Sequence, residues 1–151
     1  MELISNDFSE NGIIPSKFTC DGENISPELK LLEVPDSAKS LALIVDDPDS
    51  PAGSFVHWVI YNMPAYKLEI EQNFPKNERF TDGTLQGTND FRNIGYDGPC
   101  PRSGVHRYYF KLYAVDTFLN LPPGAIKIEV MRAMKDHIVS QTELIGHYKK
   151  K

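Results

Sequence analysis

Four polar side chains interrupt apolar stretches near the expected ends of β-strands, and their types suit the binding of an anion: Asp47, His57, His106 and Tyr108. A buried polar group without a partner costs on the order of 1–3 kcal/mol, so several such groups are better explained if they converge on one another and on a ligand. If Asp47 accepts a hydrogen bond from one imidazole nitrogen, it favours the cationic ring and leaves the other nitrogen to donate to a phosphate. The tyrosine hydroxyl can donate as well. The residue types therefore predict a small anion pocket.

Each of these residues, taken alone, also has a purely structural interpretation. Asp47 precedes Pro48, so its carboxylate could cap the backbone of an Asp-Pro turn. A single histidine in an apolar strand, such as His57 or His106, is more often a core residue with a satisfied hydrogen bond. The repetition of the pattern at several strand ends favours a shared site.

Cys100 is followed six residues later by His106, a pair that also suits a nucleophile and its base. Asp47 or Asp90 would then orient the imidazole for acyl or phosphoryl transfer. The prolines on both sides of Cys100, however, limit how the backbone can aim a thiol or supply oxyanion N–H groups. Neither Gly-x-Ser-x-Gly nor Gly-x-x-x-x-Gly-Lys occurs in the chain. A Cys/His-dependent hydrolase is therefore the alternative, and we expect no enzyme activity.

Cys20 and Cys100 are the two cysteines of the chain, and with His57 and His106 they form a nominal Cys₂His₂ set for zinc. The close pair of ligands usual in such sites, as in Cys-x-x-Cys, is missing. We therefore expect no metal and no other cofactor. Two thiols in a chain without an export signal are usually reduced, so we also expect free cysteines.

Strand and helix signals place these residues on a mainly β framework. Segments 41–45 and 54–61 are apolar on both faces, as in central strands that are covered on both sides. Segment 107–116 alternates with a period of two, which predicts a half-buried strand. Apolar residues recur every four positions through 126–138 after a Pro-Pro-Gly turn, which predicts a helix. A strand at 144–148 completes a mainly antiparallel β-sandwich with a peripheral helix near the C-terminus.

Side-chain alternation along these strands assigns the histidines to faces. His57 should face the same side of its strand as Phe55 and Val59. His106 should continue the apolar row that contains Tyr108.

Length and composition predict a single domain over residues 1–151. The chain has 40% hydrophobic residues and a formal net charge of -5, with no repeat or low-complexity segment. The only basic run, Lys149–Lys151, is typical of a solvated tail, so nothing indicates nucleic-acid binding. No apolar run approaches the roughly 18–20 residues of a membrane span, and the N-terminus does not look like a secretory signal, so we expect a cytoplasmic protein without a transmembrane segment.

Two motifs in the same order resemble those of the phosphatidylethanolamine-binding proteins, also called Raf kinase inhibitor proteins. Asp47-Pro-Asp-Ser-Pro51 looks like the family's DPDxP signature, and Gly104-Val-His-Arg-Tyr108 matches its GxHRY signature. The segment Gly53–Trp58 looks like the one that leads into the family's pocket histidine. The resemblance covers nearly the whole chain, and the closing Glu143–Tyr148 is most similar to the bacterial and archaeal branch.

The resemblance implies a two-sheet antiparallel β-sandwich of the Greek-key type, with a small cavity at one end for phosphate-like anions or phospholipid headgroups. Carried over by motif, the ligand-binding residues are Asp47, His57, Pro99, His106 and Tyr108. The residues expected in a supporting role are Asp49, Pro51, Trp58, Cys100 and Arg107.

The rim of that pocket would be the loop Gly98–Gly104, in which the family often has consecutive prolines after the glycine. Here Pro99 is followed by Cys100, so we expect this cysteine to shape the wall without taking part in turnover. For Asp49 and Arg107, a structural tie between loop and sheet is at least as well supported as ligand contact. Family members are also linked to inhibition of kinases or proteases, so a protein-interaction inhibitor acting through the rim is a second alternative. The sequence does not identify a protein partner, and it leaves open whether the protein forms a homodimer.

Overall fold

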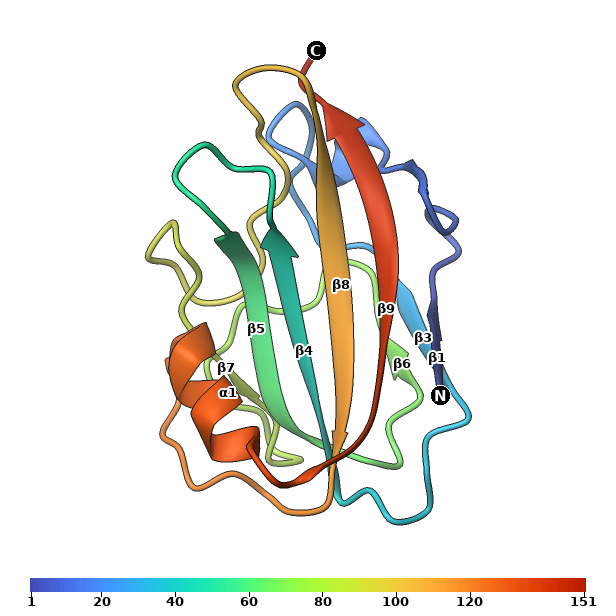
Figure 1. Cartoon of the computed structure of the whole chain (residues 1–151), viewed down its shortest axis with the longest axis vertical. Coiled ribbons are helices and arrows are strands. Elements are labelled where there is room, and N and C mark those ends of the chain that lie inside the picture. The colour runs from blue at the N-terminus through green and yellow to red at the C-terminus, as the bar shows by residue number, and fades with distance from the viewer.

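Two β-sheets form the body of the protein in the computed structural model, which describes all residues from 1 to 151 (Figure 1). The larger sheet has six strands in the order β2-β9-β8-β4-β5-β7, and the smaller has three in the order β1-β3-β6. The strands of the larger sheet are β2 (Gly12–Ile13), β4 (Ser40–Asp47), β5 (Phe55–Pro64), β7 (Leu85–Gln86), β8 (Val105–Val115) and β9 (Ile138–Lys149). The others are β1 (Glu2–Ile4), β3 (Leu29–Leu32) and β6 (Glu69–Ile70).

Neighbouring strands are antiparallel except for β2 and β9, which run parallel. The main core lies between the two sheets and includes Leu31 of β3, Leu43 of β4 and Phe110 of β8. A second cluster joins the other face of the larger sheet to helix α1 (Lys127–Met134), which Figure 1 shows beside β5. The prediction of a mainly antiparallel, two-sheet protein with a helix near the C-terminus is confirmed.

The central strands have the burial that their sequences predict. Every residue of β4 is buried, and so is every residue of β5 except its first. Along β8, burial alternates from Tyr108 to Leu112, with Phe110 buried and Tyr109 and Lys111 only half-buried. The larger sheet is therefore covered on both faces at β4 and β5 and on one face along the first half of β8.

Helix α1 is shorter than the sequence predicted, because Ile138 begins β9 instead of ending the helix. Lys135 already leaves helical geometry, with φ −52° and ψ 133°, and Asp136 has a left-handed φ of 69°. From Ile138 onward, β9 pairs with β8 as far as Lys149, so it is also longer than the predicted strand. Long-range strand pairing outweighs the local spacing of apolar residues here.

No helix is long and apolar enough to cross a membrane, since α1 has 8 residues.

Candidate functional site

A pocket of about 400 Å³ lies at the end of the larger sheet where β4 ends and both β5 and β8 begin. This is the upper end in Figure 1, where the loop between β4 and β5 and the loop before β8 meet. Antiparallel neighbours bring these strand ends together, which is why residues far apart in the sequence share one site. The lining residues are Asp47, Ser50, Pro51, Ala52, Phe55, His57, Phe91, Cys100, Pro101, Arg102, His106 and Tyr108.

Asp47 and His106 form a hydrogen-bonded pair on the pocket wall. The Nδ1 atom of His106 lies 2.6 Å from Oδ2 of Asp47, and both side chains are largely buried. The other carboxylate oxygen, Oδ1, accepts a hydrogen bond from the backbone N–H of Asp49 at 2.8 Å. The carboxylate thus fixes the imidazole so that Nε2 is the ring nitrogen left for a ligand. The hydrogen bond between Asp47 and an imidazole nitrogen that the sequence predicts is present.

His57 is held by a backbone carbonyl, whereas His106 is held by a carboxylate. Its Nδ1 atom lies 2.7 Å from the backbone carbonyl oxygen of Asp97. A carbonyl can only accept, so Nδ1 carries the proton. Burial lowers the pKa of His57, although the carbonyl and the Asp47 charge act against it, so the ring is neutral at pH 7. In this neutral ring, the Nε2 atom is therefore a hydrogen-bond acceptor.

A β-bulge places His57 in the pocket. In the pairing of β4 with β5, Val45 lies opposite Trp58 and Asp46 opposite Val56, which leaves His57 as the extra residue. Trp58 packs in the core between the sheets, whereas Val59 packs on the helix side of the larger sheet.

The predicted sharing of one face by His57 and Val59 is therefore wrong, because the bulge interrupts the alternation on which it rested. His57 instead lines the pocket together with Phe55.

Tyr108 supplies a buried hydroxyl that makes no hydrogen bond of normal geometry in the protein, although it lies near the Asp47 carboxylate. The residue is 1% exposed, and its ring lies edge-to-face against His57, with 5.3 Å between ring centroids. Burial, then the negative charge of Asp47 and the approach of the hydroxyl to that carboxylate, raise the pKa of Tyr108 above its ordinary value, so the phenol stays protonated. An unpartnered buried donor is costly, and an acceptor in the pocket would satisfy it.

An aromatic wall, which the sequence analysis missed, forms the apolar side of the pocket. Phe55 and Phe91 lie edge-to-face with 4.8 Å between ring centroids, and each also contacts the ring of His57. Phe91 lies outside the strands, on a loop tied to β5 by Asp90, whose carboxylate accepts from the Val56 N–H at 2.7 Å. Phe55 lies in the segment Gly53–Trp58 that resembles the family, whereas no local sequence pattern marks Phe91.

Three expected supporting residues stand outside the pocket lining: Asp49, Trp58 and Arg107. The indole of Trp58 donates to Oε1 of Gln86 at 2.7 Å within the core. Arg107 is an exposed tie to the loop after β4, since its Nε and Nη2 atoms donate to the two oxygens of Asp49 at 2.9 and 2.8 Å. These hydrogen bonds lower the pKa of Asp49 to about 2. Pro51, by contrast, does line the pocket.

Pro99 was expected in the pocket wall, but Pro101 lines the pocket in its place. The Pro99 carbonyl instead accepts a hydrogen bond from the backbone N–H of Cys20 at 3.1 Å. Next to it, a Cβ atom at position 98 would come within 2.0 Å of the Phe18 carbonyl oxygen, so only glycine fits. The rim loop thus packs closely on the segment around Cys20.

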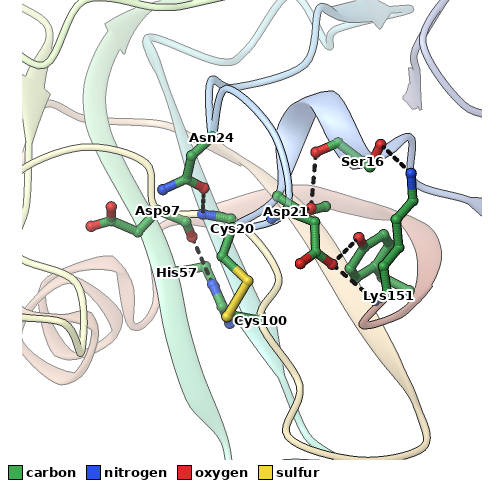
Figure 2. The surroundings of a disulfide bond; sticks show 11 residues. Ser16, Cys20, Asp21, Asn24, His57, Asp97, Cys100 and Lys151 are labelled. Atoms are coloured by element: carbon green, nitrogen blue, oxygen red, sulfur yellow. Dashed lines mark hydrogen bonds between the residues drawn. A yellow bond between two sulfur atoms is a disulfide. The ribbon is translucent and has the colours of Figure 1, made fainter.

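Cys20 and Cys100 form a disulfide between these two segments, next to Asn24 and Asp97 (Figure 2). The expectation of free cysteines is therefore wrong, because the fold brings the two Cα atoms to 5.5 Å across 80 residues of sequence. Cys100 does line the pocket, as expected, but it has no thiol to act as a nucleophile. The disulfide also removes both thiolates from the nominal Cys₂His₂ set for zinc. The cytoplasmic location, which rested on the lack of a membrane span and of a secretory signal, stays a prediction.

Comparisons with known proteins agree over nearly the whole chain. A family model described as phosphatidylethanolamine-binding protein matches residues 4–149. A UPF0098 protein of Methanothermobacter thermautotrophicus is 53% identical over 150 residues, which cover 99% of both chains. A UPF0098 protein of Pyrococcus horikoshii is 47% identical over 152 residues, covering 98% of this chain and 76% of the relative.

Two solved structures share the fold. A homolog of phosphatidylethanolamine-binding protein from Chlamydia trachomatis has a TM-score of 0.90 and 40% identity, covering 99% of this chain and 97% of that one. E. coli YbcL, described as a new member of the mammalian PEBP family, has a TM-score of 0.89 and 28% identity, covering 99% and 98%.

Proposed function

Because the chain belongs to the phosphatidylethanolamine-binding protein family, we propose that its pocket binds a phosphate-like anion, either free or as part of a phosphate ester such as a lipid headgroup. The observation that carries this proposal is the buried Tyr108 hydroxyl, which makes no hydrogen bond of normal geometry and belongs to a residue lining the same pocket as the Asp47–His106 pair. A phosphate oxygen would accept from this hydroxyl and from Nε2 of His106. Both donors would then be satisfied by one anion.

The contact with His57 decides which protonation state of the phosphate binds. Nε2 of His57 is an acceptor, since Nδ1 donates to the Asp97 carbonyl. It requires a donor on the ligand, and a phosphate monoester has one only while it retains its P–OH group. The pocket would therefore bind the monoanion in preference to the dianion.

The proposed function is binding without turnover. The cysteine in the pocket wall is part of a disulfide, and Ser50, the hydroxyl at the rim, makes no hydrogen bond to His57 or His106. No nucleophile is thus held against a base, as covalent catalysis would require. Regulation of a kinase or protease through the rim stays a prediction of the family resemblance.

The change Tyr108→Phe tests the proposal directly, because it should separate ligand binding from stability. Removing an unsatisfied buried hydroxyl should leave the free energy of unfolding unchanged or raise it slightly, while phosphate binding should weaken by roughly tenfold or more. Urea unfolding and calorimetric titration with inorganic phosphate measure the two effects.

The matched control is Tyr61→Phe on the helix side of the sheet. The Tyr61 hydroxyl accepts from the Ala125 N–H at 3.2 Å and donates to the Pro122 carbonyl. This variant should lose about 1 kcal/mol of stability and keep its phosphate affinity. Unchanged phosphate binding by Tyr108→Phe, or no binding by the unaltered protein, would refute the proposed function.

Affinity for a phosphate monoester should fall as the pH rises from 5.5 to 8. The ligand loses its P–OH group near pH 6, and with it the donor that Nε2 of His57 requires. His57 does not reverse the trend, because burial lowers its pKa and favours the neutral ring despite the Asp97 carbonyl and the nearby carboxylates of Asp47, Asp97 and Asp90.

Calorimetric titration with propyl phosphate at several pH values measures this dependence, with sulfate as the matched anion that has no ionisable hydroxyl over this range. Propyl phosphate should lose more affinity than sulfate between pH 5.5 and 8. An affinity that is flat or rises with pH would contradict the assignment of donors and acceptors.

A further inference from the structure

Arg102 is the only lysine or arginine that lines the pocket. It lies on the rim loop two residues after Cys100, so the disulfide anchors the loop close to it. The side chain is exposed and makes no ion pair or hydrogen bond within the protein, in contrast to Arg107, which is tied to Asp49 by two hydrogen bonds. A free guanidinium therefore stands at the mouth of the pocket.

The pocket offers no corresponding free negative charge. Asp47 is its only carboxylate, and each of its two oxygens already accepts a hydrogen bond, one from Nδ1 of His106 and one from the Asp49 N–H. The Asp97 carbonyl is likewise engaged by His57. An ammonium group on a ligand would find no unengaged carboxylate among the lining residues.

We infer that Arg102 determines specificity, so that the pocket selects phosphate monoesters whose remaining groups carry no positive charge and disfavours aminoalkyl phosphates such as phosphoethanolamine. The inference rests on the proposed function, since it concerns the part of the ligand beyond the phosphate. A guanidinium pairs with phosphate oxygens through two parallel N–H groups and repels an ammonium at the same distance. The volume of about 400 Å³ leaves room for an organic group beside the phosphate.

The aromatic wall is the one feature that would favour an ammonium. Phe55 and Phe91 could hold a cation over a ring face, but their edge-to-face contacts with each other and with His57 cover part of those faces. A cation–π contact at an exposed site changes affinity by only a few-fold. It is thus too weak to offset the repulsion of the ammonium by Arg102.

Propyl phosphate and phosphoethanolamine test this inference, because they have nearly the same size and differ in the charge of the terminal group. Their dissociation constants should be measured by calorimetry at pH 6 and low salt for the unaltered protein, Arg102→Gln and Arg132→Gln. Arg132 lies on α1 and does not line the pocket, so it is the matched control.

We expect the unaltered protein and Arg132→Gln to bind propyl phosphate about tenfold more tightly than phosphoethanolamine. Arg102→Gln should lose most of this preference, through weaker binding of propyl phosphate, and the preference of the unaltered protein should decrease with added salt. A preference that survives in Arg102→Gln, or tighter binding of phosphoethanolamine by the unaltered protein, would overturn the role of Arg102 and leave the proposed function standing. Binding of neither ligand would overturn both.

Discussion

Loss of the Cys20–Cys100 disulfide is expected to lower the free energy of unfolding by about 4 kcal/mol. The bond joins residues 80 apart in the sequence, and a cross-link over so long a loop removes much of the conformational entropy of the unfolded chain. Urea unfolding of the oxidised protein, the reduced protein and the Cys20→Ser/Cys100→Ser variant measures the effect.

The double variant avoids leaving one unpaired thiol, and it also provides the control. Reductant should shift the unfolding midpoint of the unaltered protein but not that of the variant. Equal midpoints for the oxidised and reduced forms of the unaltered protein would contradict the stabilising role of the bond.

The change His106→Ala should weaken the binding of inorganic phosphate by about 100-fold. It removes the donor at Nε2 and also leaves the Asp47 carboxylate without the imidazole that pairs with it at 2.6 Å. A hydrogen bond to a charged group contributes about 1.5–3 kcal/mol, and an uncompensated carboxylate in the wall would in addition repel the anion. Calorimetric titration with phosphate at constant pH gives the ratio of dissociation constants.

The matched control for this change is Tyr109→Phe on the same strand. Tyr109 is outside the pocket lining, and its hydroxyl accepts only from Nη1 of Arg107 at 3.1 Å. Phosphate affinity should stay within about twofold in this variant. His106→Asn serves as a second variant if the alanine form does not fold, and equal losses in the His106 and Tyr109 variants would mean that the pocket is placed on the wrong face of β8.

The sequence predicted the parts of the fold that depend on local patterns. The continuous apolar runs of β4 and β5 and the alternation of β8 are properties of short segments, so their existence could be inferred without knowing their neighbours. The end of α1 could not, because the apolar spacing continues past the turn at Asp136 into a strand that pairs with β8.

The site was predicted as far as its residues lie in motifs at strand ends. Asp47, His57, His106 and Tyr108 all line the pocket. The bulge that turns His57 into the pocket is visible only in the pairing of β5 with β4, so its relation to Val59 was misjudged.

Two contributions come from segments that carry no local signal. Phe91 reaches the pocket on a loop held to β5 by Asp90. Cys20 bonds to Cys100 although the two are 80 residues apart in the sequence. Neither relation has a fixed spacing or a repeated pattern, so only the three-dimensional arrangement reveals it.

A crystal structure of the protein grown with inorganic phosphate would show directly whether the pocket binds this anion. We expect one phosphate in the pocket, with the Tyr108 hydroxyl, Nε2 of His106 and Nε2 of His57 each at the hydrogen-bonding distance of about 2.6–3.2 Å from its oxygens. A pocket that holds only water at a phosphate concentration that saturates binding in solution, or a phosphate bound elsewhere without these three atoms, would contradict the account.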